Sequence, residues 1–220
     1  MHRERMKYLR AKAGVLLELL QRDLFGKSLD FDGEVAVTAE PLPFAEAVKL
    51  PRKKVTRGEV WGTDWECGFF KLHAVIPSEW AGHAVVAKLN LGGEGLLFDM
   101  DGKAIQSVTN SSLFNATYLR ELVPVTDKAQ GGESVDFYVD AAANDYFGLD
   151  WRMRPRSIDE AKLGATGLIR AMEIWTFYPE VQSLYFDVEV IYGLLRTMDD
   201  NSYRARQLAA ILSKASDLYA

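Results

Sequence analysis

AVVAKLNLGGEGLLFDMDGKAIQSV, residues 84–108, contains three short apolar runs separated by turn residues. The runs, at 84–91, 95–99 and 104–108, are rich in the branched and apolar side chains that favour extended backbone. Asp101-Gly102 has the composition of a tight hairpin turn between the last two runs, because glycine adopts positive φ without a Cβ clash. The stretch therefore predicts antiparallel strands joined by short turns.

The same pattern continues on both sides of this stretch, from Val60 to about Trp175. Further short runs at 68–76, 117–122, 134–142 and 168–175 bring the expected strands to seven. Seven short strands at this spacing are typical of an antiparallel β-sandwich or jelly roll. The chain has 220 residues, of which 48% are apolar, so it is long enough to bury one full core. We therefore expect a mainly β fold with its sandwich at 55–178.

Helical periodicity flanks the β pattern. Apolar residues recur at three- and four-residue steps from Met6 to Leu24, with Gly26 as the expected stop, and again in two stripes after Pro179. Asp199-Asp200-Asn201-Ser202 supply N-cap chemistry for the second of these stripes. We expect a helix and an irregular approach segment with short extended pieces, such as 34–38, at 1–54, and a helical hairpin at 179–220. The last helix meets no Gly or Pro stop signal, as in a truncated chain, so we expect a further domain beyond it.

Composition excludes several classes of partner. A formal charge of −5 and a pI near 5.3 argue against nucleic-acid binding, and we interpret the one dense basic run, at 52–54, as a solvated loop. The apolar runs are far shorter than the roughly 20 residues of a membrane span. The single cysteine, Cys67, forms no intramolecular disulfide, and the N-terminus has no signal-peptide pattern. These features predict a cytoplasmic protein without a membrane role.

Catalytic and metal-binding motifs are missing from the sequence. The three histidines, His2, His73 and His83, form no His-x-His or His-Glu-x-x-His cluster, so we expect no metal site. There is no Gly-x-Ser-x-Gly elbow, P-loop or dinucleotide fingerprint, and the Gly-rich run at 91–95 precedes a strand rather than a helix. We interpret Cys67 as a small buried residue rather than a nucleophile. The sequence therefore predicts no catalytic residue.

Aromatic residues are concentrated in the β region, where they suit either core packing or stacking on sugar faces. For most of them, packing in the core or at a domain interface is the more frequent role. Some polar residues near turns could bind a sugar hydroxyl or a cation, although turn formation is their commoner role. Our candidates for sugar or domain-interface contacts are Trp61, Trp65, Glu94, Asn144, Asp145 and Trp151.

A set of short segments becomes informative through its order along the chain. The segments are Trp65-Glu66-Cys67-Gly68-Phe69-Phe70-Lys71, Ile76-Pro77-Ser78-Glu79-Trp80-Ala81-Gly82, Gly93-Glu94-Gly95-Leu96-Leu97, Asp101-Gly102-Lys103-Ala104-Ile105-Gln106, Ala142-Ala143-Asn144-Asp145-Tyr146-Phe147-Gly148 and Tyr185-Phe186-Asp187-Val188. This ordered set resembles the N-terminal, non-catalytic region of α-mannosidases of glycoside hydrolase family 38, in their cytosolic and vacuolar branch. The resemblance runs from about Trp61 to the C-terminus.

The resemblance implies a jelly-roll or galactose-binding-like sandwich with helices, placed before a seven-stranded α/β catalytic barrel. It also implies that the zinc-binding His-x-His-x-Asp motif and the catalytic Asp belong to that barrel. Neither has a counterpart here, so no catalytic or metal residue is transferred. The chain itself then needs no cofactor, while zinc or another divalent metal is expected in the parent enzyme.

The expected function is that of an accessory domain, which packs on the catalytic remainder of the same polypeptide and stabilises it, with a homo-oligomer interface as a further role. The parent would hydrolyse terminal α-mannosides in glycans by a zinc-assisted, retaining double displacement. One alternative is a carbohydrate-binding module that holds a mannose-containing glycan through exposed aromatics. Another is a free-standing interaction protein.

Overall fold

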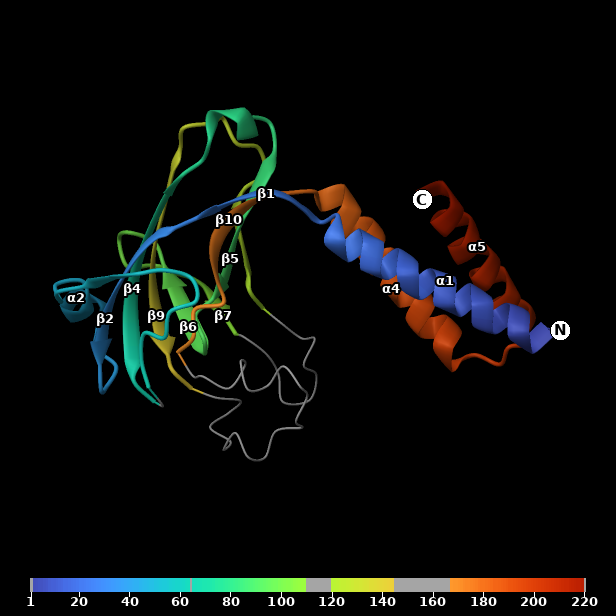
Figure 1. The fold of residues 1–220 in the computed structure, drawn as a ribbon, viewed down its shortest axis with the longest axis horizontal. Helices are drawn as coiled ribbons and strands as arrows, with labels where there is room; N and C mark the ends of the chain where they lie inside the picture. The colour runs from blue at the N-terminus through green and yellow to red at the C-terminus, as the bar shows by residue number, and fades with distance from the viewer. Residues whose placement is uncertain (1, 64, 110–119, 145–166, 220) are drawn as a thin grey trace. The chain divides into compact units, whose positions relative to one another are not determined.

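The first and last parts of the chain form one structural unit and its middle forms another. The computed structural model describes residues 2–63, 65–109, 120–144 and 167–219 (Figure 1). One unit combines residues 1–26 with 177–220, and the other spans residues 27–176. We had expected boundaries after residues 54 and 178.

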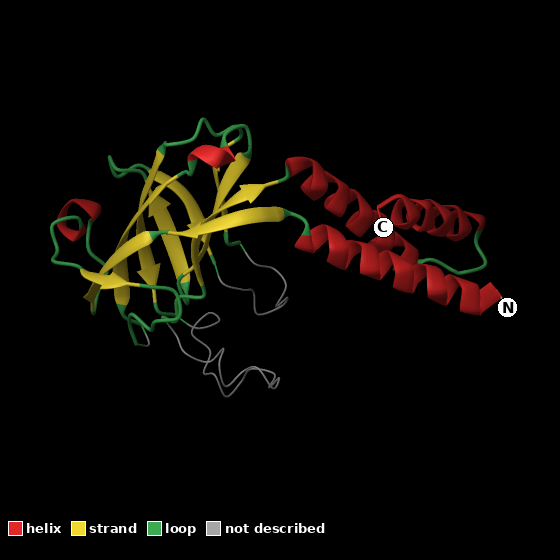
Figure 2. Ribbon diagram, turned by 45° about the horizontal axis from the view of Figure 1, so that its top comes forward, coloured by secondary structure: helices red, strands yellow, loops and turns green. Residues whose placement is uncertain are grey.

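The middle unit contains two β-sheets, whose strands are drawn in yellow in Figure 2. The four-stranded sheet has the order β1-β10-β5-β8 and the six-stranded antiparallel sheet has the order β3-β2-β4-β9-β6-β7. The strands are β1 Phe25–Asp30, β2 Asp32–Thr38, β3 Lys53–Val55, β4 Cys67–Val75, β5 Ala84–Asn90, β6 Glu94–Phe98, β7 Ala104–Val108, β8 Leu122–Thr126, β9 Ser134–Ala142 and β10 Ala171–Phe177. Short helical turns occur at α2 Phe44–Ala47 and η1 Ser78–Trp80.

The two sheets share one hydrophobic core, which confirms the expected antiparallel β-sandwich. Alternation along β9 shows how it is built: Val135, Phe137, Val139 and Ala141 are buried, whereas the residues between them are more exposed. Residues from both sheets join the same cluster, including Phe70 and Leu72 of β4 with Leu89 of β5 and Ile174 of β10.

The segment expected to be an irregular approach to the sandwich is instead part of both sheets. β1 lies at the edge of the four-stranded sheet, and β2 lies inside the six-stranded one, between β3 and β4. The basic run at 52–54 was expected to be a solvated loop; Lys53 and Lys54 are indeed exposed, but they belong to the strand β3 rather than to a loop. These strands pair with partners distant in sequence, such as Asp32 with His73, so the turn-rich local composition concealed them.

One expected strand lies partly outside the described residues. We predicted a strand at 117–122, but residues 117–119 lie outside the described ones and β8 begins at Leu122. β8 contains Pro124, which lacks a backbone N–H and is tolerated in a strand at the edge of a sheet.

The second unit consists of three helices, α1 His2–Arg22, α4 Pro179–Thr197 and α5 Tyr203–Tyr219. Their buried faces form a separate core that includes Leu16 and Leu20 of α1, Leu195 of α4 and Leu212 of α5. The predicted N-terminal helix and C-terminal hairpin are confirmed, although α1 ends at Arg22 and Gly26 belongs to β1. None of the helices in the described part combines the length and apolar content that crossing a bilayer requires.

Candidate functional site

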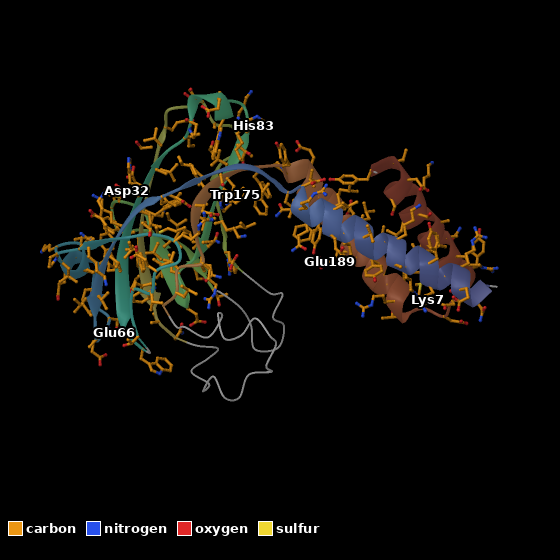
Figure 3. The ribbon with its side chains drawn as sticks, viewed as in Figure 1. Lys7, Asp32, Glu66, His83, Trp175 and Glu189 are labelled. Carbon is orange, nitrogen blue, oxygen red and sulfur yellow. The ribbon has the colours of Figure 1, made fainter. Side chains whose placement is uncertain are left out.

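A shallow groove of about 560 Å³ opens on the outer face of the six-stranded sheet. Asp140 and Ala142 contribute to it from β9, where they alternate with the core residues Val139 and Ala141. The groove lies where β4 and β6 begin and β9 ends, close to Glu66, which is labelled in Figure 3. Its lining consists of Pro41, Cys67, Glu94, Gly95, Ser107, Val108, Thr109, Arg120, Asp140 and Ala142.

Two of the residues selected from the sequence meet at the end of this groove. The side-chain Nδ2 of Asn144 donates to Oε2 of Glu94 at 2.8 Å, and the backbone N–H of Glu94 donates to Oδ1 of Asn144 at 2.9 Å. This reciprocal pair joins the start of β6 to the residues that follow β9. Both side chains remain accessible, so the pair presents polar atoms to a ligand as well as fixing the turn.

Trp65 lies at the same end of the sheet. Its backbone N–H donates to the carbonyl of Ala143, the residue before Asn144, at 2.9 Å. The residue has a positive φ of 71° and its side chain is 61% exposed. A non-glycine residue in this conformation costs free energy, and an exposed indole gains little from burial. Trp65 is one of several exposed aromatic side chains in the described residues, together with Tyr8, Phe186 and Tyr203.

Asp140 gives the groove a carboxylate that we did not single out in the sequence. Partial burial raises the pKa of Asp140 above its ordinary value. The pKa of the Cys67 thiol is raised as well, first by burial and then by the negative charges of Asp140 and Glu40. Because a raised pKa keeps Cys67 protonated, it is a poor nucleophile. Alternation along β9 indicates that Asp140 faces outward. Every half-exposed strand shows this pattern, so it does not identify Asp140 as a site residue.

The remaining candidates divide between the core and the undescribed part of the chain. Trp61 is only 3% exposed, its Nε1–H donates to the carbonyl of Leu91 at 2.6 Å, and its ring packs edge-on against Phe70. A buried indole of this kind cannot stack on a sugar. Asp145 and Trp151 lie outside the described residues.

The titratable side chains outside the groove include one exposed histidine and two buried carboxylates. Within the ranges that the structure describes, no three His, Cys, Asp or Glu side chains converge as a metal would require. His73 makes an exposed contact of 2.8 Å between its Nδ1 and Oδ1 of Asp136. Buried carboxylates have structural partners: Glu173 accepts from Trp175 Nε1 and pairs with Arg57, while Glu121 accepts from Asn90.

Comparison with known proteins shows which protein family this sandwich matches. A family model described as the jelly roll domain of alpha-mannosidase matches residues 30–168. Alpha-mannosidase G of Dictyostelium discoideum is 26% identical over 196 residues, and alpha-mannosidase 2C1 of Mus musculus is 26% identical over 188 residues. Each match covers 86% of this chain but only 17% of the relative. Among solved structures, a beta-glucuronidase of Faecalibacterium prausnitzii matches with a TM-score of 0.33 and 14% identity, over 69% of this chain and 31% of its own.

Proposed function

The chain belongs to the family of α-mannosidase jelly-roll domains, and from this premise we propose that it is the non-catalytic N-terminal part of a longer α-mannosidase. The observation that carries the proposal is the coverage: the relatives match almost all of this chain while the chain spans only 17% of their length. A sandwich of this size can stabilise the catalytic remainder by covering its apolar surface. The domain then acts through packing rather than chemistry.

The chemistry belongs, in this proposal, to the part of the polypeptide that lies outside these 220 residues. The remainder hydrolyses terminal α-mannosides in glycans with retention of configuration. It also holds the divalent metal, zinc, that assists the reaction. The described residues of this chain supply no convergent set of metal ligands, so no catalytic step is assigned to them. We further propose a cytoplasmic location and a homo-oligomeric parent.

An activity assay tests the proposal directly. The purified 220-residue chain and the longer polypeptide are incubated with an aryl α-mannoside, each with and without added zinc or cobalt. We expect metal-dependent cleavage by the longer polypeptide and none by the chain. Cleavage by the chain itself would show that it contains an active site, and an inactive longer polypeptide would remove the α-mannosidase from the proposal.

Binding of a mannose-containing glycan is a second candidate function, placed at the end of the sheet where Glu94 and Asp140 line the groove; Trp65 and Asn144 lie outside that lining. Trp65 offers an exposed aromatic face, while Glu94, Asn144 and Asp140 offer hydrogen-bonding groups at the same end of one sheet. Such a mixture of one aromatic face and several polar groups suits the alternating C–H and O–H surfaces of a sugar.

Tryptophan fluorescence tests glycan binding. Titration of the chain with manno-oligosaccharide is expected to change the emission, and Trp65→Ala is expected to abolish that change. Tyr203→Ala removes an equally exposed aromatic from α5 and serves as the matched control. A change that persists in Trp65→Ala, or no change at millimolar sugar with the unaltered chain, contradicts this candidate.

A further inference from the structure

Helix α4 carries apolar side chains on two opposite faces. Its inner face is buried against α1 and α5 through residues that include Val188 and Leu195, which are at most 3% exposed. Residues roughly half a helical turn away from Val188 form a second stripe on the exposed side. We call this set the outer stripe of α4, and its members are Ser183, Phe186, Val190, Gly193, Leu194 and Thr197.

The outer stripe is accessible, and its members are uncharged, with the exposed carboxylates of Asp187 and Glu189 on its two flanks. Phe186, Val190 and Leu194 follow one another at four-residue steps, and they are 52%, 63% and 48% exposed. The two hydroxyl groups of the stripe point back to the helix itself, since Ser183 donates to the carbonyl of Pro179 and Thr197 to that of Leu194. Nothing lies within 4 Å of a Cβ built on Gly193, so the middle of the stripe is open.

A helix that is apolar on both faces is typical of a buried helix rather than a surface one. Helix α5 shows the contrast, because its exposed Ile211 and Leu218 are not at neighbouring turns and Lys214 lies between them, whereas Phe186, Val190 and Leu194 follow one another turn by turn. Apolar residues scattered in this way are ordinary on a surface, whereas a continuous stripe marks an interface. The outer stripe therefore lacks a covering element in the described part of this chain.

We infer that the outer stripe of α4 packs against the remainder of the same polypeptide, an inference that rests on the proposed function. The relatives are several times longer than the region they share with this chain, so most of their surface lies outside it. A covalently linked partner is present at high effective concentration, which allows a small apolar contact to stay formed. The exposed side chains of Phe186, Val190 and Leu194 suit an apolar partner surface, because burying them against it removes apolar area from water.

Thiol accessibility in two forms of the protein tests this inference. Val190→Cys and, as the matched control, Ile211→Cys are each introduced into the 220-residue chain and into the full-length α-mannosidase. Both positions are more than half exposed in the chain, so both introduced thiols are expected to react quickly with a maleimide there. In the full-length protein we expect the rate for Val190→Cys to fall by at least about tenfold, because a buried thiol reacts only when its surroundings open. The rate for Ile211→Cys is expected to stay within about twofold.

The outcomes separate this inference from the function on which it rests. Equal reactivity of the Val190→Cys thiol in both forms, in a full-length protein that still cleaves an aryl α-mannoside, overturns the interface and leaves the function standing. The thiol could also become protected in the isolated chain as the chain concentration rises. That result overturns the inference as well, because a second copy of the chain then covers the stripe. Mass spectrometry of the labelled peptides assigns each rate to its own thiol. Circular dichroism of both cysteine variants verifies that the helices are retained.

Discussion

Gly68 lies on the core face of β4, directly against the indole of Trp61. A Cβ at this position would lie 2.5 Å from Cζ3 of that ring. The ring has no room to move, because its Nε1–H is bonded to Leu91 and its face meets Phe70. We expect Gly68→Ala to lower the free energy of unfolding by about 1–3 kcal/mol through overpacking. Urea unfolding followed by tryptophan fluorescence measures this loss.

Gly62 provides the control for this prediction. The nearest atom to a Cβ built on Gly62 lies at 3.5 Å, which is an ordinary contact. Gly62→Ala is therefore expected to change the free energy of unfolding by no more than about 0.5 kcal/mol. Equal stability of Gly68→Ala and Gly62→Ala would show that the Trp61 ring is free to shift.

Glu121 gives the sandwich a pH dependence. Burial raises its pKa above the ordinary value, against the smaller opposing effects of the Asn90 hydrogen bond and the charges of Lys88 and Arg170. The folded state therefore favours the protonated Glu121 carboxyl. The stability that this provides is fully present below the unfolded pKa of about 4.3, and it is lost as the pH rises through the folded pKa and the buried group becomes charged. We expect Glu121→Gln to raise the free energy of unfolding at pH 7, where it removes a buried charge. At pH ~3.5 the carboxyl is already protonated, so removal of the charge is expected to change nothing.

Denaturant unfolding at the two pH values measures this difference. Glutamine keeps an oxygen that can accept from Asn90, so the substitution removes mainly the charge. Glu46→Gln, at an exposed position on α2, removes a charge without burial and is the matched control. A Glu121→Gln variant that is less stable than the wild type at pH 7 would contradict the assigned sign.

At the scale of elements, the single turn of α2 covers an aromatic cluster on the outer face of the six-stranded sheet. The Phe44 ring centroid lies 5.3–5.7 Å from those of Phe69, Phe98 and Tyr138. The Arg52 guanidinium lies 5.5 Å from the centroid of Tyr138 and 5.7 Å from that of Phe69. This cover explains why Phe69 is buried although it points away from the core.

We expect Phe44→Ala to lower the free energy of unfolding by about 2–3 kcal/mol, somewhat less than for a fully buried phenylalanine. Phe44→Leu retains much of the apolar surface and is expected to lose about half as much. Urea unfolding measures both. If Phe44→Ala is as stable as the wild type, α2 rests on the sheet without stabilising it.

Local patterns explain which elements were predictable. The hairpin between β6 and β7 was evident from Asp101-Gly102, and its turn is held by Oδ1 of Asp99, which accepts from the backbone N–H groups of Asp101 and Lys103. β1 and β3 were missed and β2 was expected only as a short extended piece at 34–38, because the turn residues around them interrupt the local strand pattern. The site followed the same rule: Glu94 and Asn144 were recognised as turn residues, but their contact across fifty residues depends on the sheet.

The sequence also did not indicate which tryptophan side chains are buried. Trp61 and Trp65 are four residues apart and belong to the same aromatic-rich run, yet one is in the core and the other is exposed. Gly68 leaves space for the Trp61 ring in the core, whereas Trp65 has a positive φ in the turn before β4. Both depend on tertiary structure.

At the scale of the whole molecule, the chain contains two separate hydrophobic cores. One lies in the sandwich and the other among α1, α4 and α5. All five tryptophans fall between residues 61 and 175, within the sandwich unit, while the long helices belong to the other. Tryptophan fluorescence therefore reports on the sandwich, and far-ultraviolet circular dichroism reports mainly on the helices.

Two cores without shared members predict two unfolding transitions. Leu16 is 1% exposed in the helical core. We expect Leu16→Ala to lower the free energy of unfolding of the helical unit by about 2–5 kcal/mol. In Leu16→Ala the circular dichroism transition should move to lower urea while the fluorescence transition stays in place. Leu72→Ala, in the sandwich core, should move the fluorescence transition instead. If Leu16→Ala displaces both transitions by the same amount, the two units unfold as one, and the helices then transmit any stabilisation from the rest of the polypeptide directly to the sandwich.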